Sequence, residues 1–420
     1  MYKHYLKQML QLFKENKLIS CISILGTALS ICMIMVIVIL YQMNTENMAP
    51  ELNRDRMLYI NDITVVTDKF RGTNGMSRYL MLEGFGTLQL PERVAAIGGG
   101  LRECFMSVPG IKEEMNGELL LTDASFWQMF DFIFVAGSAY TEEEFESAVK
   151  SVVIDEAYAR TLYGSAAMAV GKRIDLDYEE YTVKGVVKSV NPFFKSTYAN
   201  VWLPYTVDPN LARIETTNLG GYTGGLSCYI LAASSSDIPA IRLEVQGVLD
   251  RFNANNKKLK LMLDEPPLNH FDQTFRSDQI DPTALRLRYI LIITLLLLVP
   301  AINLTGLTFS HMQKRQSEMG VRRAFGATQL QLLKQVLMEN VIYSLLGGVV
   351  GLLLAYASLW LFDEILLRTT SQGETMLSLD MLHPLVFVYT FLFCLLFNCL
   401  SAGIPALRVS RANIVSSINN

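Results

Sequence analysis

Charged side chains are scarce in this sequence. Asp, Glu, Lys and Arg together make up 18% of its 420 residues, and the net charge is only −4, whereas soluble proteins average about 25% charged residues. Disordered chains and nucleic-acid-binding chains both need a high charge density, so the composition excludes these two classes. The hydrophobic share of 51% and the mean hydropathy of +0.27 instead indicate a membrane protein.

Histidine and cysteine are also few. The chain has four histidines, none of them in an H-E-x-x-H or mixed Cys/His pattern, so neither a metal-ligand set nor a nucleophile paired with a base is evident. We therefore expect that this chain is not an enzyme and binds no metal or cofactor itself. Four of the six cysteines lie inside apolar runs, which leaves Cys104 and Cys228 as the candidate disulfide pair. The sequence leaves their pairing open.

Four stretches contain no Asp, Glu, Lys or Arg: residues 18–41, 289–310, 341–362 and 385–407. Each is long enough for a transmembrane helix, which needs about 20 apolar residues. The alternative is four buried core helices of a soluble protein, but these runs consist of Leu, Ile, Val, Met and Phe with scattered small residues. The first stretch exceeds the roughly 7–15 residues of a signal-peptide core and no A-x-A cleavage site follows it, so we read it as a retained anchor.

Positive charges indicate the orientation, because Lys and Arg in short loops stay on the cytoplasmic side. Four lysines precede the first stretch, five Lys and Arg lie in 311–340, and two arginines follow the fourth stretch, whereas 363–384 has four acidic residues and one arginine. Both termini are therefore expected in the cytoplasm. The predicted order is an amphipathic cytoplasmic segment at 1–17, a span at 18–41, an external domain at 42–288, a span at 289–310, a cytoplasmic loop at 311–340, a span at 341–362, an external loop at 363–384, a span at 385–407 and a cytoplasmic tail at 408–420.

The external segment 42–288 alternates between the apolar periods of strands and of helices, which predicts a folded α+β domain. The segment 238–252 places its apolar residues on one helical face. Strands at 228–231 and 259–263 would flank this helix as a β-helix-β unit, and the segments 219–225 and 264–282 are expected to be loops. Further strands are predicted at 57–60, 63–67, 151–154, 181–187 and 200–203.

Two acidic clusters in this domain have structural explanations. Thr141 followed by Glu144 has the spacing of a capping box that begins a helix. A second cluster lacks the glycine and the 12-residue spacing of a calcium loop, so we interpret it as a solvated hairpin rather than a cation site. Its members are Asp175, Asp177, Glu179 and Glu180.

The cytoplasmic loop carries the most specific motif. From residue 314 the chain reads K-R-Q-S-E-M-G-V-R-R-A-F-G-A-T, which resembles the R-x-x-E-I-G-I-R-R-A-L-G-A signature of the MacB/FtsX-like ABC transporter permeases. The resemblance implies that this loop engages an ATPase; the alternative is a basic loop that faces anionic lipid. We predict a short basic helix that ends at a glycine. The matching residues are Arg315, Glu318, Gly320, Arg322, Arg323, Ala324, Gly326 and Ala327.

Other parts of the chain resemble the same family. Residues 121–126, 152–164, 170–174 and 181–187 are similar to its periplasmic core, and Asn303 stands where the family often has Asn. We expect Asn303 to contribute to helix packing. Gly347, Gly351 and Ala355 form a small-xxx-small face on the third predicted span, which permits close approach of another helix. The partner of that face is either a helix of the same chain or a second copy.

The resemblance implies a non-catalytic permease subunit in a bacterial inner membrane. Neither a Walker A lysine loop nor an LSGGQ-like signature occurs, so ATP and Mg²⁺ would be bound by a separate cytoplasmic ATPase dimer. A second permease chain, identical or not, and a periplasmic adaptor or outer-membrane protein are further expected partners. The implied role is mechanotransmission for efflux or export. The alternatives are an FtsX-like regulator of an extracytoplasmic protein such as a cell-wall hydrolase, and a sensor or scaffold without an ATPase; the cargo is left open.

Overall fold

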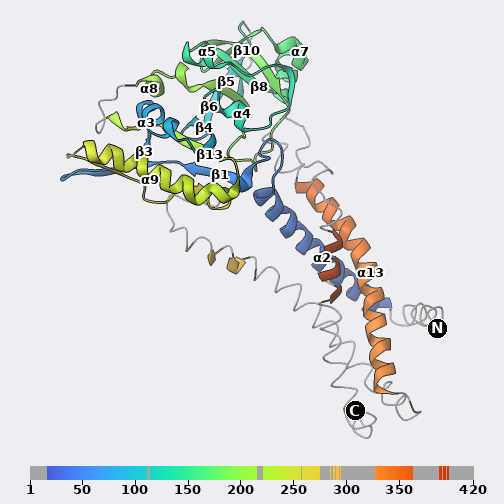
Figure 1. Cartoon of the computed structure of the whole chain (residues 1–420). Helices are drawn as coiled ribbons and strands as arrows, with labels where there is room; N and C mark the ends of the chain where they lie inside the picture. The colour runs from blue at the N-terminus through green and yellow to red at the C-terminus, as the bar shows by residue number, and fades with distance from the viewer. Residues whose placement is uncertain are drawn as a thin grey trace. The chain divides into compact units, whose positions relative to one another are not determined.

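The computed structural model of the chain (Figure 1) forms two compact units. The first contains Met1–Gln42, Thr283–Leu366 and Leu377–Asn420, and the second contains Met43–Pro282 and Leu367–Met376. The residues that the structure describes are 17–110, 114–214, 221–256, 258–274 and 328–362, together with 284, 287–288, 290–292, 294, 326, 387–389, 391–393 and 395–396.

Two long helices dominate the first unit. They are α2, Lys17–Thr45, and α13, Gln329–Phe362, which overlap the predicted spans 18–41 and 341–362. Across the described ranges, the structure holds no helix with both the length and the apolar character needed to cross a membrane. The predicted spans 289–310 and 385–407 lie mostly outside the described residues.

The second unit is an α+β domain whose strands form a single mixed sheet. In Figure 1, β1, β13 and α9 lie in one part of this unit, and β8, β10, α5 and α7 lie in the other. The strands are β1 Met57–Ile60, β2 Ile63–Val66, β3 Arg71–Met76, β4 Pro91–Gly98, β5 Arg102–Ser107, β6 Met115–Thr122, β7 Phe134–Gly137, β8 Ser151–Asp155, β9 Arg173–Leu176, β10 Glu179–Val187, β11 Val201–Pro204, β12 Thr223–Gly224, β13 Leu226–Ala232, β14 Lys260–Met262 and β15 Leu268–Asn269.

The helices of this domain are mostly short. The α-helices are α3 Arg78–Glu83, α4 Phe126–Met129, α5 Glu142–Glu146, α6 Glu156–Tyr163, α7 Ala166–Ala169, α8 Pro209–Ala212, α9 Ile238–Asn255 and α10 His270–Thr274. Single 3₁₀ turns lie at η1 Arg54–Arg56, η2 Phe85–Thr87, η3 Tyr205–Val207 and η5 Ser235–Asp237.

The half of the sheet that contains β8, β10 and β11 has buried strands that are rich in valine, a β-branched residue. β8 is buried along its whole length and runs parallel to β10, and β11 lies between β8, to which it is antiparallel, and β6, to which it is parallel. Trp202 of β11 is fully buried. Its ring packs at right angles to Phe132 and near Trp127, so aromatic side chains fill the core of this half.

The other half contains β1, β13 and the amphipathic helix α9. Ile241, Val245, Val248 and Leu249 of α9 are buried, which confirms the predicted helical face. β14, the strand that follows α9, pairs with β2, whereas β13, the strand that precedes α9, pairs with β1 and β4. The β-helix-β order is therefore present, but its two strands are not neighbours.

Several sequence predictions are confirmed, and two are wrong. Strands occur at all the predicted positions with ends shifted by at most two residues. The predicted loop 264–282 instead contains β15 and α10, and the predicted loop 219–225 contains the two-residue β12. Both errors have one cause, because these short elements are formed by pairing with distant strands: β15 with β1 and β12 with β3.

The two acidic clusters have the structures that the sequence predicted. Thr141 and Glu144 form a reciprocal capping box at the start of α5. The second cluster lies on the antiparallel hairpin of β9 and β10, where Asp177 and Tyr178 make the turn with φ of 49° and 69°. Cys104 and Cys228, whose pairing the sequence left open, are buried free thiols.

Candidate functional site

The predicted coupling motif lies almost wholly outside the described residues. Only Gly326 is described: it is exposed, forms a turn and has φ +93°, a conformation that favours glycine. Thr328 and Gln331 then begin α13 with reciprocal bonds, since each side chain accepts a hydrogen bond from the other residue's backbone N–H, at 2.9 and 3.3 Å. These contacts form a capping box. At the described end of the motif, Gly326 thus has a left-handed backbone conformation, and the capping box of α13 begins two residues later. Arg315, Glu318, Gly320, Arg322, Arg323 and Ala327 lie outside the described residues.

The small residues of α13 lie against α2 within the helical unit. A Cβ atom added to Gly347 would meet the Thr27 side chain at 2.8 Å, and one added to Gly351 would lie 2.8 Å from the Ala28 carbonyl oxygen. Ala355 is buried. The backbones of the two helices therefore approach too closely for larger residues. Asn303, the fourth predicted packing residue, lies outside the described residues.

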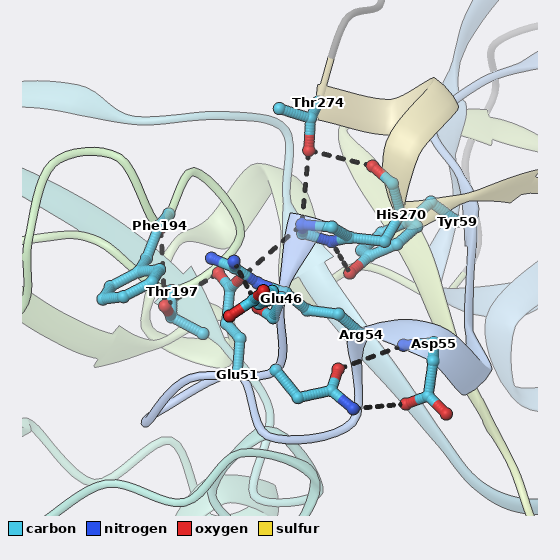
Figure 2. A network of polar contacts seen from close by, with 10 residues as sticks. Glu46, Glu51, Arg54, Asp55, Tyr59, Phe194, Thr197, His270 and Thr274 are labelled. Carbon is cyan, nitrogen blue, oxygen red and sulfur yellow. Dashed lines mark hydrogen bonds and ion pairs between the residues drawn. The ribbon is translucent and has the colours of Figure 1, made fainter. Parts of the chain in front are cut away.

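The second unit contains a buried polar cluster that the sequence did not predict. Three chain segments form it: the stretch from Glu46 to β1, the loop between β10 and β11, and β15 with α10 (Figure 2). We call it the junction cluster. It consists of Glu51, Arg54, Thr197 and His270.

Glu51 is the centre of the junction cluster. Its side chain is 1% exposed, and one carboxylate oxygen accepts a hydrogen bond from Arg54 Nε at 2.7 Å. The other oxygen accepts a bond from the Thr197 hydroxyl at 3.0 Å. His270 Nε2 lies 3.9 Å from the carboxylate. A single carboxylate thus contacts all three segments.

Arg54 adds two further contacts. Its Nη1 donates to the Glu46 carbonyl oxygen at 2.8 Å, and its guanidinium lies over the Phe194 ring at 4.7 Å from the ring centre. A guanidinium over an aromatic face gains electrostatic energy from the ring. Arg54 therefore contacts both the segment that follows α2 and the loop that precedes β11.

His270 is held by hydroxyl groups on both sides. Its Nδ1 lies 3.0 Å from the Tyr59 hydroxyl, and its Nε2 lies 3.3 Å from the Thr274 hydroxyl; Figure 2 shows the ring between these two side chains. Burial, together with the positive charge of Arg54, lowers the pKa of His270 to about 3. The imidazole is therefore neutral at physiological pH.

Burial acts on Glu51 in the same way, favouring its neutral form. It raises the pKa of Glu51, and the charge of Arg54 opposes this effect. Because the carboxylate accepts bonds from Arg54 and from Thr197, the arrangement is that of a buried ion pair with a neutral histidine beside it. Removal of either charged partner from such a pair leaves an uncompensated buried charge.

Further contacts join the same segments around the junction cluster. The side-chain amides of Asn61 and Gln273 exchange two hydrogen bonds, at 2.7 and 3.0 Å. The Lys195 ammonium donates to the Thr274 carbonyl oxygen at 3.0 Å. α10 is therefore bonded both to the segment beside β1 and to the loop that precedes β11.

Sequence reasoning missed the junction cluster because its members are far apart in the chain. Thr197 is 146 positions from Glu51 and Tyr59 is 211 positions from His270. His270 lies in a segment predicted as a loop, and no local pattern marks it. Among the described residues, no group of three or more His, Cys, Asp or Glu side chains is placed to hold a metal ion.

Family models match both parts of the chain. The model of the MacB-like periplasmic core domain matches residues 20–248, and that of the FtsX-like permease C-terminal region matches residues 290–414. The chain belongs to the MacB/FtsX-like permease family. The resemblance carried by the cytoplasmic motif and by the core-domain segments is thereby confirmed.

Individual relatives are distant. The chain is 24% identical to the "Probable syringafactin export ATP-binding/permease protein SyfD" of Pseudomonas syringae over 73% of this chain and 42% of that protein. It is 26% identical to the macrolide export ATP-binding/permease protein MacB of Burkholderia lata over 55% of this chain and 32% of that protein. It is 24% identical to MacB 1 of Yersinia pestis over 81% of this chain and 50% of that protein. The chain spans half or less of the length of these relatives.

Two solved structures of extracytoplasmic regions are also similar. The extracellular domain of the noncanonical ABC-type transporter YknZ from Gram-positive bacteria matches 48% of this chain and 100% of its own length, with 14% identity and a TM-score of 0.32. The periplasmic region of MacB from Actinobacillus actinomycetemcomitans matches 48% of this chain and 88% of its own length, with 14% identity and a TM-score of 0.31.

Proposed function

We propose that this member of the family is a permease subunit that converts ATP hydrolysis by a separate ATPase into motion of its extracytoplasmic domain. The observation that carries the proposal is the motif from Arg315 to Ala327, which matches the coupling signature and falls inside the FtsX-like region 290–414. A short basic helix that ends at Gly326 has the size and charge to bind a groove of a cytoplasmic partner.

The proposed topology has four spans, at 18–41, 289–310, 341–362 and 385–407, with both termini in the cytoplasm of a bacterial cell. It rests on the four uncharged stretches and on the Lys and Arg bias of the short loops. In this arrangement, the α+β domain lies outside the membrane and the coupling motif lies inside the cell.

The proposed complex contains two copies of the permease, or this chain with a related one, and two ATPase chains that bind ATP and Mg²⁺. Relatives named for export carry ATP-binding and permease functions in one protein, which supports the pairing of these two activities. A periplasmic adaptor or outer-membrane protein would receive the cargo.

Co-purification tests the proposal directly. The tagged chain is extracted from its native host in mild detergent, with and without a non-hydrolysable ATP analogue, and its partners are identified by mass spectrometry. We expect an ABC ATPase in about equal amount. If no ATPase co-purifies under either condition, the chain is not an ATPase-coupled permease.

The coupling motif gives a second test. Replacement of Glu318, Arg322 and Arg323 together by Ala should uncouple ATP hydrolysis from the cellular function while the chain still inserts in the membrane, because the charges that would bind the ATPase are gone. The matched control replaces Lys314 and Lys334, basic residues of the same loop that lie outside the signature, by Ala. Equal activity of the triple variant and the control would contradict the role of the motif.

An FtsX-like regulator of an extracytoplasmic enzyme is the second candidate, and the match of residues 290–414 to the FtsX-like model fits it as well as the transporter. Both candidates bind an ATPase, so co-purification does not separate them. The regulator predicts that a cell-wall hydrolase or a similar enzyme co-purifies and is activated. The transporter predicts that a compound accumulates in cells that lack the chain.

A further inference from the structure

The first and the last described segments of the extracytoplasmic domain meet at one place in the fold. α2 ends at Thr45, and β1 begins 12 residues later at Met57. β15 and α10 are the last elements described in the domain. β1 and β15 are hydrogen-bonded neighbours, with Leu58 opposite Asn269 and Tyr59 opposite Leu268. The segment that follows α2 and the last described segment of the domain are therefore joined at one pair of strands.

The junction cluster lies at this pair of strands. Arg54 binds the Glu46 carbonyl oxygen, in the stretch that directly follows α2, and His270 is the first residue of α10. Glu51 contacts both of these residues. The cluster therefore ties the segment that leaves one predicted span to the segment that approaches the next.

The cluster also reaches the other half of the sheet. Thr197 belongs to the loop that follows β10 and precedes β11, and its hydroxyl donates to Glu51. Its carbonyl oxygen accepts a bond from the Trp202 indole of β11 at 3.2 Å. Hydrogen bonds therefore connect Glu51 through Thr197 to Trp202, in the core of the half that contains β8 and β10.

The composition of the cluster fits a positioning role better than a purely stabilising one. A buried ion pair costs desolvation energy, and well-packed apolar residues often stabilise a core equally well. Hydrogen bonds between charged groups instead fix the relative positions of the segments that carry them, because donors and acceptors must keep their distances and angles. Here, directional bonds join Glu51 to Arg54 and to Thr197, and the His270 ring lies 3.9 Å from the same carboxylate.

We infer that the junction cluster is the link through which movement of the predicted first and second spans enters the far half of the extracytoplasmic domain, with Glu51, Arg54, Thr197 and His270 as positioning residues. This inference rests on the proposed function. Thr197 is the member to test, because its hydroxyl bonds Glu51 to the β10–β11 loop and its carbonyl oxygen continues the chain of bonds to Trp202.

Hydrogen–deuterium exchange on the complex of the full chain with its ATPase tests the inference. The probe is a non-hydrolysable ATP analogue, and the readout is the change in amide exchange on nucleotide binding. In the wild type, we expect a change in residues 43–60 and 268–274 and also in residues 191–204. In Thr197→Val, which keeps the side-chain shape, the change in 191–204 should be smaller than in the wild type while the change in 43–60 persists.

Two further variants make the result specific. Thr197→Ser keeps the hydroxyl and should show the wild-type response. Asp264→Asn breaks the exposed ion pair with Arg71 in the same domain and should leave both changes intact.

The outcomes separate the inference from the proposed function. If the nucleotide-induced changes were equal in Thr197→Val and the wild type, the inference alone would be overturned. This holds even if the variant exchanged faster in 191–204 with and without nucleotide, because such a uniform increase indicates a purely structural role of Thr197. A wild-type complex that binds nucleotide without any change in the domain would overturn the proposed mechanotransmission, and the inference with it.

Discussion

At the scale of single residues, His270 makes the junction cluster sensitive to acid. Its pKa in the folded protein is about 3 and the ordinary value is 6.5, so between these pH values the unfolded chain binds a proton that the folded chain does not. Stability should therefore fall as the pH drops below 6.5. The contribution of His270 amounts to about 2 kcal/mol between pH 6.5 and 4.5.

The His270→Asn variant tests whether His270 causes this loss of stability on acidification. Unfolding free energies of the detergent-solubilised chain are measured at pH 6.5 and 4.5 for the variant and the wild type. Burial raises the pKa of Glu51 and so gives a dependence of opposite sign, but this effect is largely common to both proteins and is reduced in the difference. The loss on acidification should be smaller in the variant, and equal losses would contradict the neutral, buried state of His270.

At the scale of secondary-structure elements, two glycines in helices should respond in opposite ways to the same change. Gly247 lies inside α9, and an added Cβ would meet nothing within 4 Å. Gly351 lies inside α13, where an added Cβ would press on the Ala28 carbonyl oxygen of α2. Gly247→Ala should stabilise the chain by about 0.5–1 kcal/mol, because alanine loses less conformational entropy in a helix, and Gly351→Ala should destabilise it.

Each substitution serves as the control for the other. The helix propensity gained is the same in both, so a difference in sign isolates the cost of the close approach between α2 and α13. Thermal unfolding of the purified variants, followed by circular dichroism, measures the two effects. Stabilisation by Gly351→Ala would show that the two helices separate readily at this position.

The elements that the sequence predicted are those with a local pattern. β8 and β10 are rich in valine, α9 repeats its apolar residues on one face, and α5 begins with a capping box. β3 has the sequence RGTNGM with mostly exposed side chains, and it is a strand because β2 pairs with it residue by residue. The junction cluster was likewise beyond prediction, since burial and distant contacts create it and no spacing along the chain encodes it.

At the scale of the whole molecule, the proposed topology predicts which surfaces face the outside of the cell. Tyr178 is 82% exposed on the β9–β10 turn, and Lys334 is exposed on α13 near the coupling motif. A membrane-impermeant maleimide should label Tyr178→Cys in intact cells, whereas Lys334→Cys should react only after permeabilisation. Labelling is measured relative to the parent chain with its native cysteines, and labelling of Lys334→Cys in intact cells would contradict the topology.

The pairing of β1 with β15 has a consequence for how the gene could be rearranged. Neighbouring strands lie about 4.8 Å apart, so the stretch between Leu58 and Asn269 starts and finishes almost at one point. Segments whose ends meet in this way tolerate insertion into, or removal from, a host protein. The extracytoplasmic domain is therefore a unit whose entering and leaving strands lie side by side. We expect recombination between related permeases to exchange this unit while each permease keeps its own membrane helices and its own ATPase.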